Sequence, residues 1–203
     1  MNIVDRVKNI LLTPKTEWPR IDSEPATIGG IYTSYVVILA AIGPICALIG
    51  QQLIGIMGLK PTLTYSLTMA LFSYGLALVA VYVSALVINA LAPNFGGTKD
   101  MVKAFKVAAY SSTAVWVAGV FNIIPLLGLL ILIALIYGLY LLFLGLPLLM
   151  RVPADKAAVY FVVVIVVQIL LYFVIGYIVA ALVMSVAGPI VQPAGTITYT
   201  LPG

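Results

Sequence analysis

Charged residues occur in only a few short clusters of this chain. The six acidic and ten basic residues lie within residues 1–24, at Lys60, within 99–106 or within 151–156. Four charge-free stretches separate or follow these clusters: residues 25–59, 61–98, 107–150 and 157–203. A charged side chain at the centre of a bilayer costs roughly 3 kcal/mol or more. The pattern therefore predicts an integral membrane protein whose charges lie at the membrane surfaces.

Composition argues against several classes of function. The chain has 203 residues, of which 64% are hydrophobic and 8% charged, whereas soluble domains have about 25% charged residues. It contains no histidine and one cysteine, Cys46, and no Asp, Glu, Lys or Arg falls inside the charge-free stretches. Intramembrane hydrolases and proton-coupled carriers need such groups. We therefore expect no enzyme, no cofactor, no metal site and, without a basic patch, no nucleic-acid partner.

The N-terminal segment has the pattern of an amphipathic helix over residues 2–12. Its apolar stripe contains Ile3, Val4, Val7, Ile10 and Leu11, and Arg6 falls among the remaining polar positions. A helix of this kind beside a membrane domain is expected to lie in the interfacial plane.

The segment that follows this helix is polar. Pro14 is expected to end the helix, and Trp18, in the polar stretch up to Pro25, is predicted to be an interfacial anchor.

The charge-free stretches predict five transmembrane helices. Residues 107–150 would form a helix about 66 Å long, twice the hydrocarbon thickness of about 30 Å, so this stretch must fold back. Pro125, within Asn122 to Gly128, marks the turn. The predicted spans are about 28–50, 65–92, 103–123, 127–149 and 158–187. The fold class is an all-α, five-helix membrane bundle preceded by the amphipathic helix.

The distribution of basic residues predicts the orientation of these spans. Nine Lys and Arg residues fall on the side of the N-terminus and only Lys60 on the other side. The positive-inside rule then places residues 1–25 in the cytoplasm, residues 26–190 in the membrane and an uncharged tail, 191–203, outside. The basic residues are expected to contact anionic lipid headgroups at the cytoplasmic face.

A few polar residues and one proline are the candidate functional positions within the spans. Small residues recur at helical spacing, as at Ala70, Ser73, Ala77 and Ala80, and are typical of close helix packing, of a polar cavity or of a homo-oligomer contact. Interior polar groups form hydrogen bonds between helices or contact a ligand. Pro44 should kink the first span. The candidates are Pro44, Asn89, Ser111, Asn122 and Gln168.

The order of several short motifs resembles the Yip1-domain family, in its compact prokaryotic form. The resemblance begins with Val7 to Leu11, Pro14 and Glu17-Trp18, and continues through Ala108 to Ser111 and Ile124 to Gly128. It implies a five-span membrane protein with a cytoplasmic N-terminus, of the prokaryotic cell membrane, and no catalytic motif. Eukaryotic members act in vesicle traffic and associate with Rab-type GTPases, and they carry a longer soluble N-terminal region, which this chain lacks.

Two functions follow from these observations. The first is a non-enzymatic protein that organises the membrane or scaffolds partners, as the surface helix and the family resemblance indicate. The alternative is a channel or transporter for a small solute or ion. This alternative is supported by the small-residue faces, the interior amides and Pro44. A water-filled polar cavity at Asn89, Asn122 or Gln168 would favour transport, whereas a tightly packed, dry bundle would exclude it.

Overall fold

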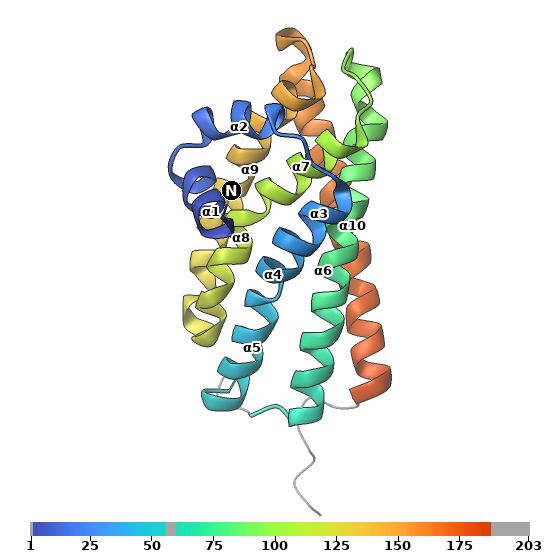
Figure 1. The fold of residues 1–203 in the computed structure, drawn as a ribbon. Coiled ribbons are helices and arrows are strands. Elements are labelled where there is room, and N and C mark those ends of the chain that lie inside the picture. The colour runs from blue at the N-terminus through green and yellow to red at the C-terminus, as the bar shows by residue number, and fades with distance from the viewer. Residues whose placement is uncertain (1, 56–59, 188–203) are drawn as a thin grey trace, which may run out of the picture.

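The computed structural model describes residues 2–55 and 60–187, and their regular structure is entirely helical (Figure 1). The tail predicted at 191–203 lies outside this range. Within the described residues, five helical segments are long and apolar enough to cross a membrane, which confirms the predicted fold class. They are Ile28–Leu53, Leu63–Phe95, Met101–Ile123, Leu126–Met150 and Ala154–Val186.

The first span is built from short pieces. The π-helix η1 (Tyr32–Val36) follows α3 (Ile28–Ile31), and α4 (Val37–Ala40) is separated from α5 (Ile42–Leu53) by a turn at Ala41. Pro44 lies in the first turn of α5, where it has no N–H to offer the carbonyl of Ala40. The helix is thus interrupted just before the proline, as expected of an interior proline.

The other spans are more regular. The fold-back of the chain lies at the two 3₁₀ turns η3 and η4, which confirms the turn predicted around Pro125. The remaining elements are α6 (Leu63–Leu91), η2 (Ala92–Phe95), α7 (Met101–Ser111), α8 (Thr113–Ala118), η3 (Gly119–Ile123), η4 (Pro125–Gly128), α9 (Leu129–Met150) and α10 (Ala154–Ala187).

The N-terminal segment forms a helical hairpin. The helix α1 (Ile3–Leu12) has the predicted extent, and the Asn2 side chain accepts a hydrogen bond from the Val4 amide at its start. Pro14 does not lead into an irregular linker. It is the first residue of a second helix, α2 (Pro14–Ser23), a position that proline favours because its missing N–H would have no helical partner there.

The α1 helix packs on the protein through most of the predicted stripe, because Ile10 belongs to the main apolar cluster and Ile3, Val7 and Leu11 pack against it. Arg6, expected on the polar face, is 5% exposed, and Ile10 is fully buried. Val4, expected in the apolar stripe, is 65% exposed. The prediction was wrong at Arg6 and Val4, because apolar spacing alone does not reveal that the protein offers Arg6 a buried carboxylate partner, Glu17.

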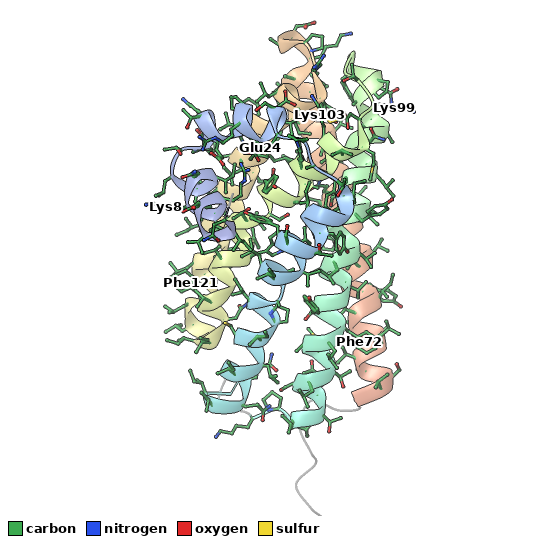
Figure 2. The ribbon with its side chains drawn as sticks, viewed as in Figure 1. Lys8, Glu24, Phe72, Lys99, Lys103 and Phe121 are labelled. Carbon is green, nitrogen blue, oxygen red and sulfur yellow. The ribbon has the colours of Figure 1, made fainter. Side chains whose placement is uncertain are left out.

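The molecule divides into two halves along its long axis. The hairpin half consists of residues 3–39, 81–114 and 141–164, and it contains every buried residue of the main apolar cluster. The cavity half consists of residues 40–53, 63–80, 115–140 and 165–187, and it contains no charged residue. In Figure 2, the labelled Lys8, Glu24, Lys99 and Lys103 lie in the upper half and Phe72 and Phe121 in the lower half.

Candidate functional site

A cavity of about 640 Å³ lies among the spanning helices, mainly in the cavity half. Residues of α5, α6, α8, α9 and α10 line it. Much of the space exists because these helices present small side chains toward one another, among them Ala47, Ala70, Ser73 and Ala77. The small-residue face predicted on the second span therefore faces a cavity. Binding pockets for small molecules span about 300–1,000 Å³, so the volume is sufficient for a ligand.

The structure brings four of the five candidate positions together. Pro44, Ser111, Asn122 and Gln168 come from the first, third and fifth spans, with Ser111 and Asn122 both on the third, and all line the cavity. Asn89 is not among the lining residues. It lies two residues before the end of α6, and its buried Oδ1 atom has no hydrogen-bond partner in the part of the chain that the structure describes.

The polar groups of the cavity differ in how well they are satisfied. The Asn122 Nδ2 atom lies 3.5 Å from the Gly43 carbonyl oxygen, a long and weak contact. The Ser112 hydroxyl donates to the Ala108 carbonyl oxygen at 2.8 Å. The Ser111 residue is 7% exposed and its hydroxyl has no hydrogen-bond partner among the described residues. The wall therefore offers both satisfied and unsatisfied polar atoms.

Sequence reasoning missed Gln51 as a cavity residue. Its position near the end of the first span favoured an outer location, yet it lines the cavity with its Oε1 atom buried and unpartnered. The neighbouring Gln52 donates instead to the Ser66 hydroxyl at 2.8 Å. In the same part of the first span, η3 approaches α5 closely. A Cβ on Gly50 would lie 2.4 Å from the Ile123 carbonyl oxygen.

The cavity continues sideways into a groove between α9 and α10. Leu135, Ile169 and Tyr172 line both the cavity and this groove, which extends to Phe173 and Tyr177. Phe173 and Tyr177 are 75% and 77% exposed. In a protein that spans a bilayer, large exposed apolar side chains at this level face the hydrocarbon chains. The cavity thus borders lipid rather than only the two aqueous phases.

The hairpin half contains a second cluster, built from buried charges. The Arg6 guanidinium binds Glu17 at 2.5 Å, binds Glu24 as well, and lies 5.5 Å above the Tyr110 ring. Glu17 is 3% exposed. A buried charge is tolerated only when it is paired, so these contacts fix α1, α2 and the segment that follows them in one arrangement.

Lys106 joins this hairpin to the third span. The residue is 4% exposed, and its ammonium donates to the carbonyl oxygens of Ile21 and Glu24, each at 2.6 Å. These carbonyls belong to the C-terminal end of α2, where helix carbonyls lack intrahelical donors and a positive charge is favourable. Lys103 adds an ion pair with Asp22 at 2.6 Å.

Trp18 occupies a different environment from the one expected of an interfacial anchor. The side chain is 1% exposed and packs edge-on against Tyr110. Its ring also fills the space beside Gly145, where a Cβ would lie 2.7 Å from the ring. Protein therefore surrounds the indole, because the C-terminal half of α9 provides a small residue for it to pack on.

The described residues show no cluster suited to a metal ion. No three His, Cys, Asp or Glu side chains gather within this part of the chain. Cys46, the one cysteine of the chain, is partly buried and unpaired. The arrangement can bind uncharged groups by hydrogen bonds and apolar contact.

Comparison with known proteins agrees with this architecture. The Yip1 domain model matches residues 8–176. The inner membrane protein YohC of Escherichia coli K12 is 35% identical over 142 residues, which cover 66% of this chain and 73% of that protein. YohC of Escherichia coli O6:H1 strain CFT073 matches equally well. No solved structure matches. With the five spans and the family match over most of its length, the chain belongs to the Yip1 domain family of integral membrane proteins.

Proposed function

We propose that this chain is a non-enzymatic protein of the bacterial cell membrane that organises its surroundings by presenting a rigid basic platform to lipid headgroups and partner proteins. The observation that carries the proposal is the ion network of Arg6, Glu17 and Glu24, in which Arg6 and Glu17 are buried. It joins α1, α2 and the segment after α2, and Lys106 fixes this hairpin to α7 through the carbonyl oxygens of Ile21 and Glu24. The family match and the inner-membrane name of the E. coli relative support the location.

The outer surface of the hairpin half has the charge that such a platform needs. Asp5 and Asp155 are its exposed acids, whereas six basic residues are exposed on it: Lys8, Lys15, Arg20, Lys99, Arg151 and Lys156. Clustered Lys and Arg beside a membrane span attract anionic lipids. The two bases that are buried, Arg6 and Lys106, serve the fold instead. We propose the cytoplasm for this face, because the positive-inside rule places basic residues there.

Retention of anionic lipid tests the platform. The protein is reconstituted in nanodiscs of mixed phosphatidylglycerol and phosphatidylcholine, and the co-purifying lipids are counted by native mass spectrometry. We expect the Lys8→Gln/Lys15→Gln variant to lose several-fold in retained phosphatidylglycerol. The matched control, Lys60→Gln, changes an exposed base that precedes α6 at the other end of the bundle. Equal losses in both variants would overturn the proposal.

A second copy of the chain is the partner that α10 favours. Gly176 and Ala180 lie four residues apart and are both exposed on this helix, and small residues at this spacing let membrane helices approach closely. We propose that they form a homodimer contact. Chemical crosslinking in liposomes should capture a dimer that Gly176→Leu abolishes, and an unchanged dimer yield would contradict this contact.

A channel or transporter is the second candidate function. The observation in its favour is that Ser111, Asn122 and Gln168 share one cavity within the spans. Solute and ion flux into proteoliposomes tests it, with Asn122→Ala as the variant. Flux that this variant reduces would establish transport, whereas no flux of any solute with lipid retention intact would leave the platform as the function.

A further inference from the structure

The wall of the cavity excludes charged ligands. Among the described residues, those that line it include no Asp, Glu, Lys or Arg. A charged group placed there would lose its hydration without gaining an ion pair, which is costly in an apolar environment. The wall instead combines aliphatic side chains with the hydroxyl and amide groups of residues such as Ser111, Asn122 and Gln168. A ligand of this cavity is therefore uncharged, mainly apolar and able to form a few hydrogen bonds.

The route into the cavity indicates where such a ligand comes from. The groove between α9 and α10 adjoins the cavity at Leu135, Ile169 and Tyr172, and these side chains are 47%, 48% and 54% exposed. They are apolar or aromatic, and they lie near the middle of long spans. An opening of this kind favours entry of a molecule dissolved in the bilayer, because a water-soluble solute would gain nothing from an apolar mouth.

Two unsatisfied polar atoms indicate what the head of the ligand carries. The Ser111 Oγ and Gln51 Oε1 atoms are buried, and neither has a hydrogen-bond partner among residues 2–55 and 60–187. A buried polar group without a hydrogen bond costs about 1–3 kcal/mol. A hydroxyl on the ligand satisfies either atom, because it both donates and accepts hydrogen bonds.

We propose that the cavity binds a single-chain, uncharged lipid with a hydroxyl-bearing head, such as a monoacylglycerol or a long-chain alcohol, taken up from the bilayer between α9 and α10. The hydrocarbon chain packs against the aliphatic wall and the head bonds to Ser111 or Gln51. This inference concerns binding, and it goes beyond the platform and beyond transport, neither of which it requires.

Photo-crosslinking in proteoliposomes tests the proposal on the full chain. The probe is a monoacylglycerol with a diazirine in its acyl chain, and the comparison probe carries a phosphate head on the same chain. Labelled residues are mapped by mass spectrometry. We expect the monoacylglycerol to label cavity residues such as Met69 and Leu139, in competition with unlabelled monoacylglycerol. Labelling confined to outward residues such as Leu71, which is 71% exposed, would overturn the proposal.

Filling the cavity should block the probe. We expect Ala77→Leu, on the cavity wall, to lower the apparent affinity about tenfold, because a larger side chain occupies the space of the ligand. The matched control is Gly75→Leu on the same helix, where the residue is exposed and an added Cβ meets nothing within 4 Å. Equal labelling in these two variants, or labelling of cavity residues by the phosphate probe as strongly as by the monoacylglycerol, would contradict the proposal.

A substitution that preserves the fold keeps the test decisive. Ser111→Ala removes a hydroxyl that has no partner, so the protein should fold at least as well. We expect it to weaken labelling by the monoacylglycerol and to leave labelling by a matched hydrocarbon probe without a head unchanged. The control is Ser185→Ala, which is exposed on α10. Unchanged monoacylglycerol labelling in both Ser111→Ala and Gln51→Leu would refute the assigned head site.

Discussion

The hairpin half and the cavity half of this bundle are stabilised in different ways. In the hairpin half, large side chains such as Trp18, Phe105 and Tyr160 are fully or almost fully buried, and buried charges are paired. The cavity half has no charged residue and retains a space of about 640 Å³. The comparison shows that one membrane bundle can combine a tightly packed, ion-paired end with a region that has room for a ligand.

The least and the most hydrophobic of the five spans show the same contrast. Met101–Ile123 has the lowest mean hydropathy of the five spans, 1.3, and is the most buried. Ala154–Val186 has the highest, 2.9, and is the least buried. Lipid is as apolar as an aliphatic side chain, so apolar residues gain little from leaving it. Polar and charged groups such as Lys106 gain partners by burial, and this places the more polar helix in the centre.

The largest effect is expected from breaking the ion network of the hairpin half. Arg6→Ala leaves the buried Glu17 carboxylate with only the exposed Arg20, 3.6 Å away, so we expect a cost near the lower end of the range of about 3–5 kcal/mol for loss of one member of a buried pair. We expect a clear fall of the Tm in detergent and faster proteolysis of the hairpin. The control Lys8→Ala, at an exposed position of the same helix, should change neither. If both variants melt alike, the network does not hold the hairpin.

A smaller but definite effect is expected where the hairpin half is most tightly packed. Gly145→Ala introduces a Cβ 2.7 Å from the buried Trp18 ring, and overpacking typically costs about 1–3 kcal/mol. In a Trp116→Phe background, the Trp18 emission should shift to longer wavelength and the Tm should fall. Gly75→Ala serves as the control, because this residue is exposed and an added Cβ there meets nothing within 4 Å. An unchanged Trp18 spectrum would contradict the packing described.

A single hydrogen bond of the hairpin half should contribute less. The Tyr160 hydroxyl donates to the Ile88 carbonyl oxygen at 2.6 Å and links α10 to α6. Such bonds between membrane helices average about 0.6 kcal/mol, so Tyr160→Phe should lower the Tm slightly. Tyr177→Phe, at a residue that is 77% exposed, should leave the Tm unchanged. A larger fall of the Tm for Tyr177→Phe than for Tyr160→Phe would show that the stabilising contact lies elsewhere.

The smallest effect on stability is expected in the cavity half. Ala77→Leu enlarges a side chain that borders empty space, so the overpacking cost seen at Gly145 should be absent. We expect the free energy of unfolding to stay within about 0.5 kcal/mol of the wild-type value. The Tm should therefore hardly change. A destabilisation equal to that of Gly145→Ala would erase the contrast between the halves and show that the cavity is closed in solution.

Some features of the candidate site followed from the sequence and others did not. Polar residues in apolar spans are few, so Ser111, Asn122 and Gln168 could be selected as candidates before their surroundings were known. That they share a cavity while Asn89 does not could not be predicted, because residues on different helices meet only through packing. Gln51 was not selected as a candidate, because a glutamine near the end of a helix can face water as well as a cavity.

The sequence alone determined the five spans, the turn at Pro125 and the interruption near Pro44, because the cost of charge in hydrocarbon and the chemistry of proline act locally. The tertiary structure decided the rest. It turned Arg6 and Trp18 inward, continued the chain into α2 after Pro14, and left space beside Ala77. These outcomes depend on partners far away in the chain, such as Gly145 for Trp18. A local sequence pattern does not indicate which helix provides the partner.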